Sequence, residues 1–264
     1  MPEAYNHGVK LHYETMGRGE PLLLVPGLGC DGGSWPVVDK MLAEKFFVVL
    51  LDNRGSGRSE CPPPPYDVVE MAEDCVCVLD HLHLDAAHVL GHSLGGAVAL
   101  ELAASRPERV RRLIACSTAA SMSRRNMQLF DAWVELLAKG GDPAAVTREI
   151  FLWMYPPDSF NHIEFLDSIV GECLANPHLQ PFEGLQGQVE ALRTLNVQGR
   201  LGQIQASTLV LHGELDQLVA LQEGSALARG IPGGRIEILE GAGHLPHRQQ
   251  PDRFTGLALD FLGA

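Results

Sequence analysis

The 264-residue sequence has no long apolar run. A membrane-spanning helix needs about 18 consecutive apolar residues, whereas the apolar stretches here, such as residues 22–25 and 46–51, are only as long as a strand. The first residues, Met1 to His7, are polar and lack the basic-then-apolar order of a secretory signal. We therefore expect a cytoplasmic protein with no membrane partner.

Cysteine is sparse, and its spacing fits neither a disulfide framework nor a metal site. The sequence has no repeated Cys-x-x-Cys element and no His-Glu-x-x-His, which are spacings typical of zinc ligands. We expect no metal and no other cofactor. The six cysteines are scattered over the whole chain, at Cys30, Cys61, Cys75, Cys77, Cys116 and Cys173.

Positive charge is also in short supply. The chain has 20 lysines and arginines against 33 aspartates and glutamates, a formal net charge of −13. Such a surface repels nucleic acid and anionic membranes and keeps the protein soluble. We expect a small-molecule substrate and no nucleic-acid partner, and an anionic substrate would need a local cation. The sequence leaves the oligomeric state open, a homodimer included.

Strand and helix patterns alternate along most of the chain. This alternation predicts an α/β protein with a mostly parallel central sheet and helices on both faces. The expected strands are residues 9–13, 22–25, 46–52, 87–91, 111–116, 208–212 and 235–239, and the clearest expected helices are residues 68–82, 93–105 and 251–262.

The alternation is interrupted between residues 121 and 196, where the patterns are helical and no convincing strand occurs. Residues 127–138 have apolar side chains at helical spacing, and Asp142-Pro143 is a typical helix start. We therefore predict a core formed by residues 1–120 and 197–264 and a helical cap formed by residues 121–196. An insert of this kind often covers an active site as a lid.

The strongest motif is Gly91-His92-Ser93-Leu94-Gly95, which matches G-x-S-x-G. In this motif a nucleophilic serine occupies a sharp, strained turn between a strand and a helix. Side chains two residues before and two residues after the serine would collide across the turn, and glycine stands at both positions. A strand pattern precedes the motif and a helix pattern follows it, so Ser93 is the predicted nucleophile.

A serine hydroxyl needs a base, and histidine is suited to that role near neutral pH. Of the 11 histidines, His244 follows a predicted strand in a glycine-rich loop and precedes the last helix. We predict His244 as the base, with His247 as its rival. His92 should point away from the nucleophile as a packing residue, and His212 should be buried structure.

A carboxylate must hold the imidazole in the correct tautomer. Asp216 follows the predicted strand at residues 208–212, and Glu214 is its near rival. The chain order serine, aspartate, histidine favours Asp216. The oxyanion that forms during acyl transfer needs N–H donors, and we predict the backbone N–H groups of Leu94 and Leu28.

These residues resemble the α/β-hydrolase superfamily over essentially the whole chain. The chain has Pro26-Gly27 where many members have His-Gly, which disfavours the epoxide hydrolase branch. Serine at position 93 disfavours the haloalkane dehalogenases, which use aspartate there, and the dienelactone hydrolases, which use cysteine. The matching landmarks, in order, are the Pro26–Gly29 loop, Asp52-Asn53-Arg54-Gly55-Ser56-Gly57-Arg58-Ser59, the Ser93 turn, the Asp216 loop and the His244 loop.

Within the superfamily, the chain is most similar to the 3-oxoadipate enol-lactonase and aminoacrylate hydrolase group. That similarity rests on Gly27-Leu28-Gly29, Ser117-Thr118-Ala119-Ala120 and Gln188-Val189-Glu190-Ala191-Leu192. It implies hydrolysis of a carboxylic ester or lactone through an acyl-enzyme. Two alternatives stay open: hydrolysis of a carbon–carbon bond in a ring-cleavage product, and a ligand receptor with little turnover.

Enol-lactonases act on anionic substrates, so a cation near the site would support that similarity. Arg124 is a candidate, although the arginines at 124 and 125 are also expected to face water, and Arg54 is expected to stabilise its own loop. The aromatic residues of the insert suit either an acyl pocket or core packing. The residues assigned to the substrate pocket are Trp133, Trp153, Phe160 and Arg124.

Overall fold

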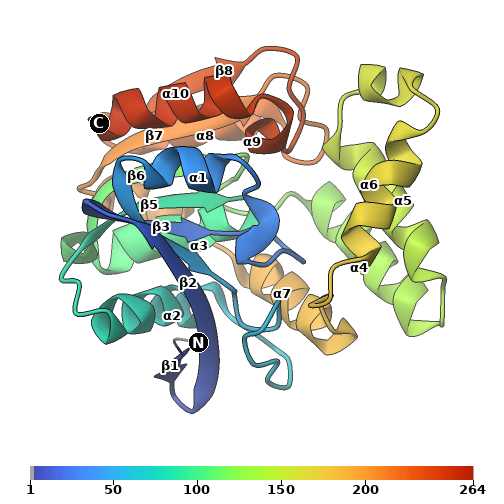
Figure 1. Cartoon of the computed structure of the whole chain (residues 1–264), viewed down its shortest axis with the longest axis horizontal. Coiled ribbons are helices and arrows are strands. Elements are labelled where there is room, and N and C mark those ends of the chain that lie inside the picture. Colours follow the sequence, from blue (N-terminus) through green and yellow to red (C-terminus); the bar gives the residue numbers. More distant parts are fainter. Residues whose placement is uncertain (1–2, 264) are drawn as a thin grey trace.

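The computed structural model describes residues 3–263 and contains an eight-stranded sheet with the order β1-β2-β4-β3-β5-β6-β7-β8 (Figure 1). β2 pairs antiparallel with β1 and β4, and all other neighbours are parallel. The predicted α/β-hydrolase fold class is confirmed. The strands are β1 (Glu3–Asn6), β2 (Val9–Gly17), β3 (Glu20–Val25), β4 (Phe46–Leu51), β5 (Ala87–His92), β6 (Val110–Cys116), β7 (Ser207–Gly213) and β8 (Arg235–Leu239).

Helices cover both faces of the sheet, and this explains why its central strands are apolar throughout. Successive side chains of a strand point to opposite faces, so Leu22 and Leu24 of β3 pack on one face and Leu23 and Val25 on the other. α1 (Val38–Ala43) and α10 (Pro251–Leu262) pack on the first face. α2 (Val68–His81), α3 (Leu94–Ser105) and α8 (Leu221–Gly230) pack on the second.

The segment between β6 and β7 forms four α-helices, drawn in green to orange beside the sheet in Figure 1: α4 (Arg124–Ala138), α5 (Pro143–Met154), α6 (Phe165–Leu174) and α7 (Phe182–Thr194). The chain leaves and re-enters the sheet region at one place, because Ser121 and Asn196 form a β-bridge and the Val197 N–H donates to Ala120 O at 2.9 Å. We call these four helices and their connections the helical insert. Its assignment as a separate cap stays a prediction.

Most of the predicted strands and helices occur within one or two residues of their expected bounds, but β1 was not expected. β1 is a short edge strand that forms a hairpin with β2, and His7 and Gly8 make the turn with φ angles of +49° and +88°. An edge strand exposed on one side carries little apolar signal, which is why the sequence pattern does not indicate it. Among residues 3–263, no helix has both the length and the apolar character needed to cross a membrane.

Candidate active site

Ser93 lies between the end of β5 and the start of α3, with φ +53° and ψ −117°. This backbone conformation is strained for any residue with a side chain. A Cβ atom at Gly91 would lie 2.1 Å from the Gly95 carbonyl oxygen, and one at Gly95 would lie 2.1 Å from the Val25 carbonyl oxygen. Both positions therefore require glycine, and the strand can turn sharply into the helix with the partly buried Ser93 at the tip of the turn.

The three residues predicted as a triad lie together at the carboxyl edge of the sheet. His244 Nε2 lies 3.0 Å from Ser93 Oγ, and His244 Nδ1 lies 2.8 Å from Asp216 Oδ2. Because the carboxylate can only accept, Nδ1 carries the proton and Nε2 is free to accept the serine proton. Hydroxyl, imidazole and carboxylate thus form one continuous hydrogen-bonded chain.

The Asp216 carboxylate is buried and is held by the backbone as well as by His244. Its Oδ1 accepts from the N–H groups of Leu218 and Val219 at 3.0 and 2.9 Å. Burial alone would raise the pKa of Asp216, but the His244 imidazole and the hydrogen bonds outweigh it, so the net pKa is lowered. The group therefore stays ionised and fixes the imidazole orientation. Glu214, the rival acid, accepts instead from the Gly241 N–H at 2.9 Å.

The backbone of His244 is clamped on both sides. Its N–H donates to Met154 O, at the end of α5, at 2.8 Å, and its carbonyl accepts from His92 Nε2 at 2.8 Å. Burial, with a smaller contribution from His244, lowers the pKa of His92 to about 3. His92 is therefore a neutral donor, and its ring packs against those of Trp35 and His247, which agrees with its predicted packing role.

The two other histidines considered as bases are buried next to the triad and do not contact Ser93 Oγ; His212 Nε2 lies 3.5 Å from Asp216 Oδ2. The His247 ring packs against Trp35 and His92, with centroids 4.8 and 4.6 Å away. His212 Nε2 donates to Val219 O at 2.9 Å. Burial lowers the pKa of both imidazoles, so both are neutral residues of the protein interior.

The Pro26–Gly29 loop lies beside Ser93, the predicted nucleophile. A Cβ atom at Gly27 would lie 3.3 Å from Ser93 Cβ. The loop is a tight turn closed by the Cys30 N–H, which donates to Gly27 O at 3.2 Å, and Gly29 has the positive φ (+75°) that a type II turn requires. Leu94, at the first position of α3, has a backbone N–H that no helical carbonyl can accept. Leu28 and Leu94 thus each follow a residue that lies next to or at the Ser93 turn, and their role as oxyanion donors stays a prediction.

None of the four residues predicted for the substrate pocket lines either of the cavities described below. Trp133 is buried against Phe130, and its indole N–H donates to Glu149 at 2.7 Å. Trp153 lies under the Arg125 guanidinium, 4.7 Å from the ring centroid, and Phe160 packs against Phe165. Arg124 is exposed at the start of α4. Their role in substrate binding stays a prediction.

Arg54 stabilises its own loop, as the sequence predicts. Its guanidinium forms two hydrogen bonds to Asp74, at 2.6 and 2.8 Å, and one to Glu70 at 2.9 Å. A buried guanidinium satisfied in this way is not available to a substrate carboxylate. The insert arginine Arg125 is exposed and donates to Gln217 O at 3.1 Å.

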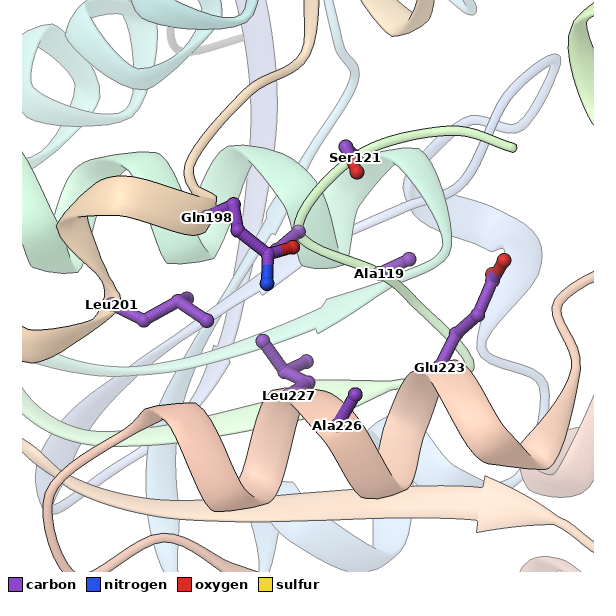
Figure 2. Close-up of a pocket in the computed structure, with 8 residues that line it drawn as sticks. Ala119, Ser121, Gln198, Leu201, Glu223, Ala226 and Leu227 are labelled. Atoms are coloured by element: carbon purple, nitrogen blue, oxygen red, sulfur yellow. The ribbon is translucent and has the colours of Figure 1, made fainter. Parts of the chain in front are cut away.

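Two of the cavities formed by residues 3–263 lie near the insert, and Ser93, Asp216 and His244 line neither of these two. The smaller one, about 100 Å³, lies between the β6–α4 connection and α8; Figure 2 shows Ser121 and Gln198 facing Ala226 and Leu227 across it. Glu223, on its rim, has a pKa raised by burial and by the Asp216 charge. The larger one, about 460 Å³, is lined by Tyr155, Pro156, Ser159, Phe165, Gly241, Arg248, Gln249 and Gln250.

One set of side chains among the described residues has donor atoms close enough to suggest a metal. These are His92, Cys116 and His247, all buried, with ligand atoms within 4.8 Å of one another. His92 Nε2 already donates to His244 O, and burial raises the pKa of the Cys116 thiol, which disfavours the thiolate that metals bind. The set packs behind the Ser93 turn as part of the protein core.

Sheet order, the strained serine turn and the acid–base pair at the carboxyl edge define a hydrolase of the α/β class. The chain belongs to the alpha/beta hydrolase family, whose model matches residues 22–257. A relative from Azorhizobium caulinodans, provisionally named carbamate hydrolase RutD, is 33% identical over 264 residues, covering 100% of this chain and 98% of its own length. The superfamily resemblance found in the sequence is thereby confirmed.

Solved structures agree over the full chain. A hydrolase from Pseudomonas aeruginosa PA01 superposes with a TM-score of 0.91 at 30% identity, covering 100% of this chain and 98% of that one. The enol-lactonase from Burkholderia xenovorans LB400 superposes with a TM-score of 0.91 at 26% identity, covering 100% of both chains. The second of these structures falls in the group that the sequence resembles most.

Proposed function

We propose that this hydrolase cleaves carboxylic esters or lactones through an acyl-enzyme on Ser93. The observation that carries the proposal is the hydrogen-bonded chain from Ser93 Oγ through His244 to Asp216, at 3.0 and 2.8 Å. The enol-lactonase from Burkholderia xenovorans, similar over the whole chain, supports the ester or lactone class.

Each step follows from the positions of these groups. Ser93 Oγ attacks the substrate carbonyl carbon while His244 Nε2 takes the hydroxyl proton, and Asp216 stabilises the imidazolium. The carbonyl oxygen becomes an oxyanion that accepts from the N–H groups of Leu28 and Leu94. The bond to the alkoxy oxygen breaks, His244 returns the proton to that oxygen, and water then releases the acid by the same route.

A carbamate is the second candidate substrate, because the relative from Azorhizobium caulinodans has a carbamate hydrolase name. The same triad would form a carbamoyl-enzyme. Its carbonyl carbon is less electrophilic than that of an ester because the nitrogen lone pair is delocalised onto it. The ratio of ester to carbamate turnover therefore distinguishes the two candidates without any change in the assigned residues.

Active-site labelling tests the proposal. Wild-type protein is treated with a fluorophosphonate and the modified peptide is identified, with Ser93→Ala as the control. We expect label on Ser93 alone and a loss of ester hydrolysis of at least about 10⁴-fold in the variant. Label on another residue, or full turnover by the variant, would refute the triad assignment.

A substrate panel then separates the reaction classes. It contains p-nitrophenyl esters, an enol-lactone, an aryl carbamate and a vinylogous diketone acid. We expect the esters and the lactone to turn over fastest. Preference for the diketone acid would favour the carbon–carbon hydrolase alternative, and a single labelling event without steady-state turnover would favour a receptor.

A further inference from the structure

Gln188, on α7 of the helical insert, reaches out of the insert to the turn beside the nucleophile. Its side chain is completely buried, and its Oε1 accepts from the Gly29 N–H at 3.1 Å. Its Nε2 donates to Arg54 O and to Ser56 Oγ, each at 2.9 Å. The oxygen and the nitrogen of this amide are therefore both hydrogen-bonded to residues outside the insert. Gln188 and Gly29 are 159 residues apart in sequence.

The contact matters because of how a peptide turn sets the direction of its N–H groups. A trans peptide is planar, with its C=O and N–H pointing in opposite directions. Asn53 Nδ2 donates to Pro26 O at 2.9 Å and so holds the plane before Gly27. The Cys30 N–H holds Gly27 O and therefore the plane that contains the Leu28 N–H.

Gln188 holds the third consecutive plane, between Leu28 and Gly29. Both peptide planes that flank Leu28 are then fixed, one from within the turn and one from the insert. Within residues 3–263 the Leu28 N–H itself has no acceptor in the protein, which leaves it for a ligand. The hydrogen bond from the Gly29 N–H to Gln188 thus links the peptide next to this donor to α7 of the insert.

We propose that Gln188 is a positioning residue for the oxyanion donor, through which the insert controls stabilisation of the transition state. This inference rests on the proposed function, because it needs Ser93 chemistry with an oxyanion at Leu28. Donor positions must match the oxyanion closely, and a displacement of about 1 Å can cost about 100-fold in rate. Gln188 acts through the backbone and does not touch the reacting atoms.

The chain provides a matched control in Gln180, which precedes α7. Its Nε2 donates to Gly55 O at 3.1 Å and to Ser56 Oγ at 2.9 Å. Gln180 thus attaches the insert to the same core loop as Gln188, but it makes no hydrogen bond to the 26–29 turn. If a substitution only loosens the insert, its effect should be the same at positions 180 and 188. An effect on the oxyanion donor should appear only when Gln188 is replaced.

The experiment compares Gln188→Met with Gln180→Met. Methionine is about the size of glutamine but lacks the amide oxygen and the NH₂ group that form these hydrogen bonds. Three quantities are measured: kcat/KM for p-nitrophenyl acetate, the rate of Ser93 labelling by a fluorophosphonate, and the inhibition constant of phenylboronic acid, which forms a tetrahedral adduct. We expect all three to worsen by about 10- to 100-fold in Gln188→Met, and by less than about threefold in Gln180→Met.

Gln188→Glu provides rescue and covers the case in which Gln188→Met does not fold. Burial raises a carboxyl pKa, and the protonated acid has the acceptor that Gly29 needs and a donor for Arg54 O or Ser56 Oγ. Activity of this variant relative to wild type should rise as the pH is lowered from 9 to 6. Equal losses at positions 180 and 188, or a Gln188→Glu variant whose relative activity does not change with pH, would overturn the inference. Absence of Ser93 labelling in wild type would instead refute the proposed function.

Discussion

The backbone N–H of His244 donates to the carbonyl oxygen of Met154 at 2.8 Å. Met154 is the last residue of α5, so the loop that carries the base is attached directly to the helical insert. Gln249 strengthens this attachment: its Oε1 accepts from the Gly243 N–H at 2.6 Å, and its Nε2 donates to Met154 O at 3.5 Å. Movement of the insert would therefore move the imidazole.

Gln249→Leu should loosen the His244 loop. The variant leaves the Gly243 N–H without its acceptor and removes the second donor to Met154 O. We expect kcat for ester hydrolysis to fall about 10-fold, since base and nucleophile must stay within hydrogen-bonding distance, and stability to fall by about 1 kcal/mol. Gln250→Leu is the control, because the side chain of Gln250 donates to Glu240 O, at 2.8 Å, and not to Met154 O. Equal kcat in both variants would contradict the prediction.

Asp216→Asn should abolish most activity through the imidazole tautomer. The Leu218 and Val219 N–H groups already occupy one oxygen of residue 216, so the asparagine NH₂ must face His244 Nδ1. Nδ1 then accepts and Nε2 carries the proton, so the base cannot deprotonate Ser93. We expect kcat to fall about 10³- to 10⁴-fold. Glu214→Gln, which alters the rival acid, should leave kcat within about twofold of wild type, and a larger loss there would reopen the choice of acid.

Stability should fall as the pH drops below about 6.5, the pKa of an unfolded histidine. Burial lowers the folded-state pKa of His92 to about 3, so below pH 6.5 the unfolded chain binds a proton that the native state does not. The stability that the neutral, buried His92 contributes is therefore fully present above pH 7 and is lost progressively as the pH falls below about 6.5. His92→Gln keeps a donor for His244 O and cannot titrate, so urea unfolding at pH 7 and pH 5 should show about 2 kcal/mol less pH dependence than wild type.

His162→Gln is the control for the pH experiment, because His162 is exposed in the insert. The free energy of unfolding of the His162→Gln variant should depend on pH in the same way as that of wild type. If His92→Gln showed the full wild-type loss between pH 7 and pH 5, the acid sensitivity would have to come from other groups.

Trp133→Phe distinguishes the two roles that the sequence left open for this residue. Trp133 joins α4 to α5 through its hydrogen bond to Glu149, and a hydrogen bond to a charged group contributes about 1.5–3 kcal/mol. We expect the free energy of unfolding to fall by about 2 kcal/mol, with KM for a series of esters unchanged. Leu136→Ala, at an exposed position of α4, is the stability control. A KM that changes with ester chain length would instead place Trp133 in the pocket.

The fold and the strained turn at Ser93 could be predicted because their signals are local. Strands buried on both faces are continuously apolar, as in residues 22–25, and the Ser93 turn needs glycines within two residues of the serine. His244 and Asp216 could be predicted from their places after consecutive strands, because the carboxyl ends of parallel strands meet at one edge of the sheet.

The tertiary structure alone decided what holds these groups in place. Gln188 contacts Gly29 across 159 residues, and Met154 accepts from His244 through backbone atoms that any residue would present. Neither contact leaves a pattern in the sequence. A single glutamine on a helix does not indicate which residue it will contact, and every residue has the same backbone carbonyl group. The sequence by itself was enough to predict which three side chains, Ser93, His244 and Asp216, meet at the edge of the sheet. Only the packing of the insert on the sheet determined how their donors and loops are fixed, because those hydrogen bonds depend on distance in space and not on spacing along the chain.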